Sequence, residues 1–336
     1  MAKIKLIDVA NLAGVSKSTA SQYLNGRFEY MSQHTKDRIA EAVKELDYVP
    51  NPIARSLKSD KTKTIGVIVR DITGFDTSRV LRGIDDFCKN GEYNVIIYNT
   101  DFDPEVEARS IRALYQLRVD GIIISSSGNN QHLLQDYSEN GLPIVEFQLE
   151  HDDTNKNIII SDYKQAAFDA TEYLIQLGHK NICFLTQNFE NVKSRNERYQ
   201  GFVSALAKHN IPLHKNLIQY WHRETGFQNS IKDMLRSPPA PTAIFTQHLA
   251  ITTDLLTQFN QEGISIPEDI SLLGFDDIPM AEFFKVPITV VKQEPYKIGS
   301  EAAKLLLAHI HNKTLANKKI LVPCSVVKRQ SCKLSA

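Results

Sequence analysis

Four polar side chains near the N-terminus have types and spacing that suit contact with nucleic acid. Lys17, Ser18, Ser21 and Gln22 fall on one face of a helix predicted over residues 17–24. Each can hydrogen-bond a base edge or a phosphate, as a helix lying in the major groove of DNA must do. We expect Lys17, Ser18 and Gln22 to read bases. Neighbouring polar side chains are expected to hold phosphates and set the register: Thr19, Ser21, Asn25, Ser32 and Thr35. The alternative is a small helical bundle with an ordinary solvated face.

The elements that must position this helix can be read from the same segment. Residues at helical spacing give a preceding helix one apolar face: Leu6, Val9, Ala10 and Ala13. Gly14 suits a tight turn, and Ser16 suits the N-cap of the second helix. A third helix is predicted after Ser32, which can serve as its N-cap, with an apolar stripe at Ile39, Ala42, Val43 and Leu46. Three short helices can bury a core that two cannot.

Composition restricts the class of protein. The 336 residues carry no net charge, but residues 1–61 hold ten Lys/Arg against seven Asp/Glu, a net charge of +3. A modest basic excess means that phosphate affinity depends on where the charges lie, and on dimerisation doubling them. The four cysteines lack the spacing of a disulfide framework or a zinc site, so we expect no metal and no cofactor. With no apolar leader and no run approaching a membrane span, we expect a cytoplasmic protein and no membrane partner.

From residue 63 onward, apolar runs alternate with helical segments. Strands are predicted near 64–69, 94–99, 121–125, 143–147, 181–186, 241–246 and 270–274. Helical patterns fill the gaps, for example at 77–90, 103–117, 164–177, 195–209 and 249–262. This alternation predicts an α/β fold with two doubly wound parallel sheets.

Ligands bind beyond the carboxyl ends of the strands in such sheets, so the residues after each strand are candidates for a binding site. After the first strand come Arg70, Asp71, Thr73 and Phe75. Gln148 follows the fourth strand, His248 follows PTAIFTQ, and Asp276 follows SLLGF. Two of these residues have an equally open alternative to ligand binding. Arg70 could lie in a solvated loop, and Phe75 could pack between the lobes.

Several motifs in sequence order resemble the bacterial LacI/GalR family of repressors. They are DVANLAGVSKSTASQYLNG (8–26), DYVPNPIARSLKS (47–59), IGVIV (65–69), LGHKNICFL (177–185), RYQGF (198–202), PTAIF (241–245), GFDD (274–277) and KRQSC (328–332). PTAIF and GFDD are weak alone, but the order and spacing of the set cover nearly the whole chain. The resemblance implies a small all-α helix–turn–helix domain and two lobes of the periplasmic-binding-protein type that close around a small molecule.

The resemblance also implies a role for the segment between the domains. Residues 50–61 could be a plain linker, but the family implies a hinge helix that orders on operator DNA and pairs with its copy in a dimer. Leu57 then matches an apolar wedge that enters the minor groove and kinks the duplex. Ile53 and Ala54 would lie at the groove, and Asn51 and Arg55 would approach the backbone or base edges.

For the effector, the resemblance matches Arg198 to a contacting arginine and aligns Trp221 with an aromatic that covers a sugar ring. A core position is equally open for Trp221, and Arg198 and Asp276 could instead be structural partners of helix termini. Two departures matter. His248-Leu249 replaces an Asn-Asp pair, which removes an acceptor for sugar hydroxyls, and DITGFDTS replaces DITNPFF. Arg70 and Arg198 suit a carboxylate or phosphate, whereas Asp276 suits hydroxyl groups. We therefore expect a carbohydrate-type effector that is a sugar acid or sugar phosphate.

Catalysis is not expected. The sequence has no GxSxG, HExxH, P-loop or GxGxxG motif, and Asp276-Asp277 are adjacent rather than placed to flank a bond. We expect a transcriptional regulator, normally a repressor, that binds near-palindromic double-stranded operator DNA and a small-molecule effector. Alternatives are a sugar-binding protein without chemistry, an effector-independent regulator that responds to a protein partner, and an enzyme acting on a sugar.

The expected domain boundaries follow from these assignments. Residues 1–49 form the helix–turn–helix domain, 50–62 the hinge helix and linker, and 63–336 the effector-binding and dimerisation domain. Lobe 1 is expected at about 63–161 and 295–318, and lobe 2 at about 162–292 and 319–334. Because no leucine heptad follows the last motif, a homodimer is favoured over a tetramer.

Overall fold

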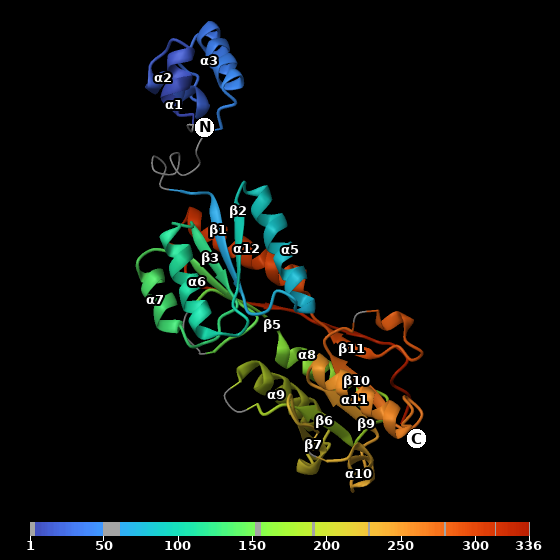
Figure 1. Ribbon diagram of the computed structural model, residues 1–336. Helices are drawn as coiled ribbons and strands as arrows, with labels where there is room; N and C mark the ends of the chain where they lie inside the picture. The colour runs from blue at the N-terminus through green and yellow to red at the C-terminus, as the bar shows by residue number, and fades with distance from the viewer. Residues whose placement is uncertain are drawn as a thin grey trace. The chain divides into compact units, whose positions relative to one another are not determined.

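The structure is a computed structural model that describes residues 4–49, 61–151, 156–189, 192–227, 229–278, 280–312 and 314–335. Contacts within the chain separate it into two compact units, Met1–Thr62 and Lys63–Ala336. Each unit is described below by itself (Figure 1). Among the described residues, no helix is long and apolar enough to cross a membrane.

Within residues 4–49, the N-terminal unit forms three helices, α1 (Leu6–Leu12), α2 (Lys17–Leu24) and α3 (Gln33–Glu45). Their small core is made by Val9, Ala13, Ile39 and Ala42. The two predicted N-caps are confirmed, since Ser16 accepts a hydrogen bond from the Thr19 amide at 3.1 Å and Ser32 accepts one from the Thr35 amide at 3.2 Å.

Gly14 makes the turn between α1 and α2, as the sequence predicted. Its φ is +61°, and a Cβ at this position would lie 2.1 Å from Nη2 of Arg38. That same nitrogen donates to the Gly14 carbonyl at 3.2 Å. The left-handed backbone therefore favours glycine here, whereas the guanidinium is the end of a flexible side chain that can move.

The larger unit contains two sheets. The first sheet has the order β12-β5-β4-β3-β1-β2, and all its pairings are parallel. Helices α5 and α12 pack on one face of it, and α6 and α7 pack on the other (Figure 1). This lobe 1 consists of β1 (Thr64–Val69), α5 (Phe75–Asn90), β2 (Asn94–Asn99), α6 (Pro104–Gln116), β3 (Gly121–Ile124), α7 (Gln131–Glu139), β4 (Ile144–Phe147), β5 (Ile158–Ser161), α12 (Pro295–His311) and β12 (Lys319–Val322).

The second sheet has the order β13-β11-β10-β9-β6-β7-β8, with β13 and β8 antiparallel at its edges. Helices α8 and α9 cover one face and α10 and α11 the other. This lobe 2 consists of α8 (Tyr163–Gln176), β6 (Ile182–Thr186), α9 (Lys193–Lys208), η1 (Lys215–Leu217), β7 (Ile218–His222), β8 (Gly226–Phe227), α10 (Ile231–Arg236), β9 (Ala243–Thr246), α11 (Leu249–Glu262), β10 (Ser271–Phe275), η2 (Ala281–Phe283), β11 (Thr289–Lys292) and β13 (Ser325–Val327).

The predicted fold class, a helix–turn–helix domain with two doubly wound parallel sheets, is confirmed. One segment differs from the expected lobe boundaries. Residues 319–334 were assigned to lobe 2, but β12 pairs with β5 in the first sheet, so Lys319–Val322 belong to lobe 1. The chain consequently crosses between the lobes three times, at residues 161–163, 292–295 and 322–325.

Candidate functional site

The predicted recognition residues lie on the exposed part of α2. Lys17, Ser18 and Gln22 are exposed, while Thr19 and Ser21 are half-buried. The Ser16 hydroxyl lies 2.7 Å from that of Ser18 and 2.8 Å from that of Thr19, which fixes the first turn of the helix. A surface of hydroxyl, amide and ammonium groups is thus presented together from one rigid helix.

The other expected DNA contacts within the described residues lie at the end of α2 and at the start of α3. Asn25 is exposed and donates its side-chain amide to the Ser21 carbonyl at 2.7 Å. Ser32 and Thr35 lie at the start of α3, with their hydroxyl oxygens 2.9 Å apart. The expected hinge residues lie outside the described part of the chain: Asn51, Ile53, Ala54, Arg55 and Leu57.

The second candidate site is a cleft of about 610 Å³ between the two lobes of the larger unit. It is lined by residues that follow the strands of both sheets, because the carboxyl ends of parallel strands share one edge of a sheet. Five of the expected effector residues meet there: Arg70, Gln148, Arg198, His248 and Asp276. Further lining residues were not expected from the sequence: Asp76, Phe102, Arg195, Arg223, Gln247 and Gln293.

Arg198 is buried, unlike the other arginines and the lysine that line the cleft. It is 7% exposed, and its guanidinium carbon lies 4.4 Å from the ring centre of Tyr163 and 4.2 Å from that of Phe275. Its Nε is buried and has no hydrogen-bond partner among the described residues. A buried donor of this kind carries an energetic cost until a ligand accepts from it.

Asp276 is the carboxylate that follows β10. It is 9% exposed, and its Oδ1 accepts a hydrogen bond from Nε2 of Gln293 at 2.6 Å. Oε1 of Gln293 in turn accepts from the Ser161 hydroxyl at 2.5 Å. The adjacent Asp277 pairs instead with Arg329 at 2.8 Å, so the two carboxylates have different partners.

Charges of the lining residues act on one another across the cleft. Burial, together with the carboxylates of Asp276 and Asp277, raises the pKa of Asp76 to about 6. Burial lowers the pKa of His248, although the neighbouring Asp276 raises it in part. Burial likewise lowers the pKa of Arg70, whose Nε donates to the Ser125 hydroxyl at 3.2 Å. The cleft is therefore strongly polar, with groups of both signs.

Four expected effector residues do not line this cleft. Asp71 accepts from the Thr73 amide at 2.8 Å and from its hydroxyl at 2.6 Å, which forms the turn before α5. Phe75 begins α5 and packs against the guanidinium of Arg79 at 4.4 Å. Trp221 is buried in the core of lobe 2, where its Nε1 donates to Asp254 at 2.7 Å. Local hydrogen bonds and core packing account for these positions.

The residues that sequence reasoning missed carried little signal. Arg195 lies three positions before Arg198 on α9, a spacing that places both on one helix face. Asp76 directly follows Phe75, but its approach to lobe 2 depends on how the lobes meet. His248 was expected, and it also caps α11 by accepting from the Ala250 amide at 3.1 Å.

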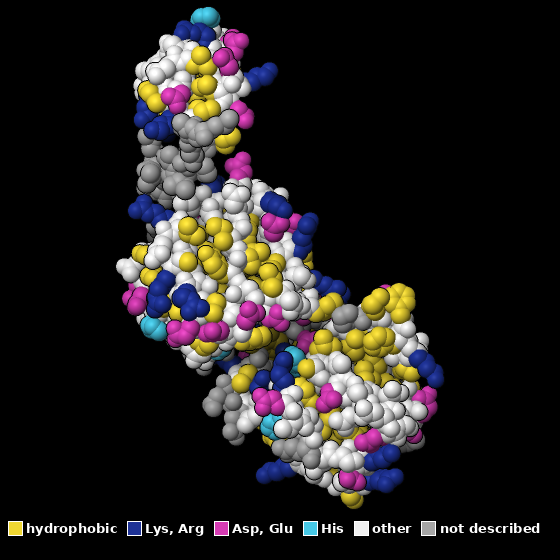
Figure 2. Space-filling model, in the orientation of Figure 1, with side chains coloured by type: hydrophobic (Ala, Val, Ile, Leu, Met, Phe, Trp, Pro, Cys, Tyr) yellow, Lys and Arg dark blue, Asp and Glu magenta, His cyan; other side chains and the backbone are white. Residues whose placement is uncertain are grey.

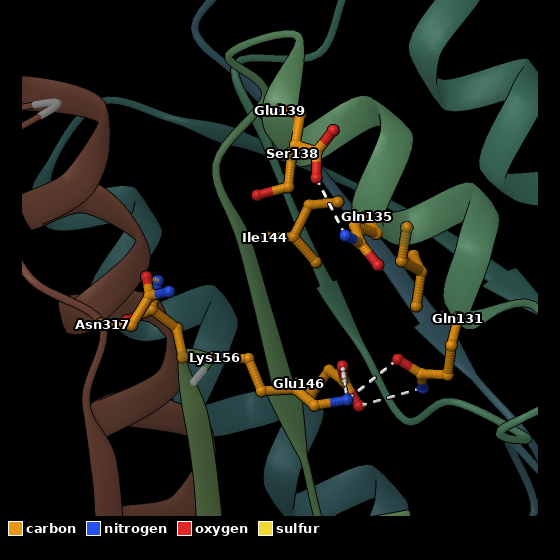
Figure 3. Close-up of a pocket in the computed structure, with 10 residues that line it drawn as sticks. Gln131, Gln135, Ser138, Glu139, Ile144, Glu146, Lys156 and Asn317 are labelled. Atoms are coloured by element: carbon orange, nitrogen blue, oxygen red, sulfur yellow. Dashed lines mark hydrogen bonds and ion pairs between the residues drawn. The ribbon is translucent and has the colours of Figure 1, made fainter. Parts of the chain in front are cut away.

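A second cavity, of about 310 Å³, lies on lobe 1 beside α7 (Figure 3). Lys156, Glu146 and Gln131 point toward one another there, and Nζ of Lys156 lies 2.9 Å from oxygens of both partners. Burial raises the pKa of Glu146 even though Lys156 lies beside it. Because its charged groups satisfy one another, this cavity is a weaker candidate than the cleft. No group of three potential metal ligands occurs in the described part of the chain.

Together, the helix–turn–helix and the two-lobed domain with its polar cleft define a DNA-binding regulator with a periplasmic-binding-protein-like domain. Residues 5–51 match the family described as bacterial regulatory proteins, lacI family, and residues 171–332 match the periplasmic binding protein-like domain. The chain belongs to the lacI family of bacterial regulatory proteins and is a DNA-binding transcriptional repressor of that family.

Two curated relatives document the membership. The chain is 36% identical over 308 residues to the probable transcriptional regulator EndR of Paenibacillus polymyxa, which covers 91% of this chain and 90% of that protein. It is 33% identical over 336 residues to the transcriptional repressor PurR of Vibrio cholerae, which covers 99% and 98%. Both relatives are transcriptional regulators by name.

Solved structures share the fold. The lac repressor dimer bound to operator and the anti-inducer ONPF has a TM-score of 0.83 at 23% identity, covering 99% of this chain and 100% of that one. The complex of the transcriptional regulator CelR with cellobiose has a TM-score of 0.69 at 24% identity, covering 98% and 99%.

Proposed function

We propose that this protein binds a near-palindromic operator as a homodimer and that a small carbohydrate-type effector in the interlobe cleft controls this binding. The observation that carries the proposal is the cleft itself, which is lined both by Arg198 of α9, a buried arginine whose Nε has no partner among the described residues, and by Asp276, a carboxylate that follows β10. Two solved structures of this fold support it, since one is a lac repressor dimer bound to operator and the other is the regulator CelR in complex with cellobiose.

On the DNA side, Lys17, Ser18 and Gln22 would read base edges while the other polar side chains of α2 and α3 hold phosphates. The test is selection of binding sequences from randomised duplex DNA by the full-length protein. Gln22→Ala should weaken discrimination at one position of each half-site by about 1–3 kcal/mol. Selection of no preferred sequence by the unaltered protein would refute this assignment.

On the effector side, Asp276 would accept hydrogen bonds from two sugar hydroxyls, and Arg198 would donate to the ligand from between its two aromatic neighbours. Gln148, His248 and Arg70 would complete the contacts. Because Arg198 and Arg70 are cations, the finer proposal is an anionic sugar derivative, either a sugar acid or a sugar phosphate. Higher affinity for a neutral sugar than for every charged derivative tested would contradict it.

The effector role of the cleft is tested with Asp276→Ala. Operator affinity without ligand should stay at the wild-type value, and the change caused by an active sugar should disappear. The matched control is Asp233→Ala, which removes an exposed carboxylate of α10 in the same lobe and should leave the response intact. An unaltered response of the Asp276 variant would show that Asp276 does not contact the effector, and it would refute the assignment of the cleft as the effector site.

The dimer proposal rests on an exposed apolar segment of lobe 2. Met280, Phe283 and Phe284 are 71%, 75% and 40% exposed, and Figure 2 shows hydrophobic side chains gathered over η2. Apolar groups gathered on a surface in this way are typical of protein interfaces. Phe283→Glu should therefore shift the protein toward monomer in sedimentation measurements, and an unchanged mass would contradict the choice of surface.

A further inference from the structure

Three guanidinium groups of lobe 2 line one part of the cleft. Arg195 and Arg198 lie in the first two turns of α9, and Arg223 lies in the turn between β7 and β8. None of the three forms an ion pair with a carboxylate within the described ranges. Lys193, at the start of the same helix, differs because it pairs with Glu150 of lobe 1 at 3.1 Å. Within the described part of the chain, the three arginines thus form a cluster of positive charge without a directly paired carboxylate.

Arg195 and Arg198 are held in place by groups that do not neutralise them, whereas Arg223 is exposed. Nη1 of Arg195 donates to the Asn188 carbonyl at 2.8 Å, and Gln247 donates to the Arg195 carbonyl at 2.8 Å. Arg198 is fixed between Tyr163 and Phe275, with its Nε buried and without a partner. Burial and the charges of Arg198 and Arg223 lower the pKa of Arg195. Like charges held together in a partly buried place are costly unless an anion joins them.

The helix on which two of these arginines lie adds to the same field. Helix α9 has 16 residues, and Val192 at its N-cap supplies no side-chain hydrogen bond to the first turn. Val192, Lys193 and Ser194 line the cleft, so this helix start faces it. The positive end of the helix dipole therefore adds to the guanidinium charges.

We infer that Arg195, Arg198 and Arg223 form an oxyanion subsite on lobe 2 that takes the carboxylate or phosphate group of the effector. The inference rests on the proposed function, because it names the charged group of that same effector. Asp76 and Asp276 would repel an anion, so the hydroxyl groups of the ligand lie toward them and its charged group lies toward the arginines. Arg70 adds positive charge to the cleft but is not part of the subsite, because it follows β1 of lobe 1 and its Nε donates to Ser125.

One consequence is that the subsite belongs to a single lobe. A small anion can occupy it without contacting lobe 1, so it competes with the effector without supplying the contacts that join the lobes. Inorganic phosphate is therefore the direct probe, and acetate tests whether a carboxylate alone is sufficient.

The experiment is calorimetric titration of the full chain with inorganic phosphate and, separately, with acetate. One phosphate should bind per chain, and Arg195→Gln and Arg223→Gln should each weaken it by about tenfold or more, because each removes a charge-assisted hydrogen bond. The matched control, Arg236→Gln, removes an exposed arginine of α10 and should change nothing. Thermal melting of each variant checks that it is folded. Equal phosphate affinity in all variants, or no phosphate binding by the unaltered protein, overturns the inference.

A second readout separates this inference from the proposed function. Operator binding is measured with a neutral sugar and with its acid and phosphate derivatives. One outcome is that neutral and charged sugars change operator affinity equally, and that the Arg195→Gln/Arg223→Gln double variant retains both responses. This outcome overturns the subsite but keeps the proposal of an effector-controlled repressor. Phosphate binding that depends on the arginines, with no carbohydrate altering operator affinity, keeps the subsite and refutes the carbohydrate effector.

Discussion

Replacing Asp76 with asparagine should increase the free energy of unfolding at neutral pH. The increase should be smaller in mild acid. Asp76 is half-buried at the start of α5, and its pKa is raised from 3.8 to about 6 by burial and by the carboxylates of Asp276 and Asp277. A carboxyl group with a raised pKa contributes stability while it is protonated. That contribution is fully present below pH 4, near its ordinary pKa, and is lost as the pH rises through about 6.

The size of the effect follows from the shift. A difference of about two pKa units corresponds to a cost of roughly 3 kcal/mol for the ionised group at pH 7.5, and about half of that at pH 5. Asparagine removes this cost at every pH but also removes the favourable interaction of a first-turn carboxylate with the helix dipole, about 0.3–1 kcal/mol. Asp76→Asn should therefore be more stable by about 2 kcal/mol at pH 7.5, and by roughly 1 kcal/mol less than that at pH 5.

Urea unfolding at both pH values tests this, followed by circular dichroism and by the fluorescence of Trp221, the only tryptophan of the chain. Asp136→Asn is the control, because it removes an exposed carboxylate from α7 of the same lobe and should have little effect at either pH. A loss of stability at pH 7.5 would refute the reasoning. So would a gain in stability that is the same at pH 5 and pH 7.5, since the cost of ionisation would then not be its source.

Three further substitutions test the other parts of the chain. Gly14→Ala should destabilise the helix–turn–helix by about 1–2 kcal/mol, because alanine rarely adopts the left-handed backbone of this turn; an unchanged melting curve of that domain would contradict this. Gly201→Ala would place a Cβ 2.1 Å from the Lys164 carbonyl and should cost about 1–3 kcal/mol by forcing α8 and α9 apart, which urea denaturation measures. Leu57→Ala should lower operator affinity and leave effector binding intact; equal operator affinity would remove the wedge assignment.

The sequence predicted the parts of the site that depend on chain order alone. Arg70, Gln148, His248 and Asp276 each follow a strand, and the carboxyl ends of parallel strands must share an edge. The caps of α2 and α3 and the turn at Gly14 were likewise predictable, because each depends on contacts within a few residues.

What the sequence could not predict depends on distant contacts. Asp76 and Arg223 reach the cleft only through the way the two lobes meet, and nothing local marks either residue. The sequence left Trp221 open between ligand cover and the core, and its indole N–H is hydrogen-bonded to Asp254 inside lobe 2. The segment Lys319–Val322 joined lobe 1 rather than lobe 2 because its partner strand β5 lies about 160 residues earlier, a register that no local pattern encodes.

The placement of Gln293 explains how a ligand in the cleft could act on the lobes. Gln293 and Ser161 lie on two of the three segments that cross between the lobes, and they join Asp276 to those segments through bonds of 2.6 and 2.5 Å. A ligand hydroxyl that donates to Asp276 shares this carboxylate with Gln293, so the ligand is linked by one hydrogen bond to a segment that crosses between the lobes. Such a ligand shifts the lobes only by the difference between its affinities for the two arrangements. Contacts confined to the arginines of lobe 2 supply no such difference in affinity. A contact with Asp276 does, because Gln293 joins Asp276 to Ser161 and so to the segments that cross between the lobes.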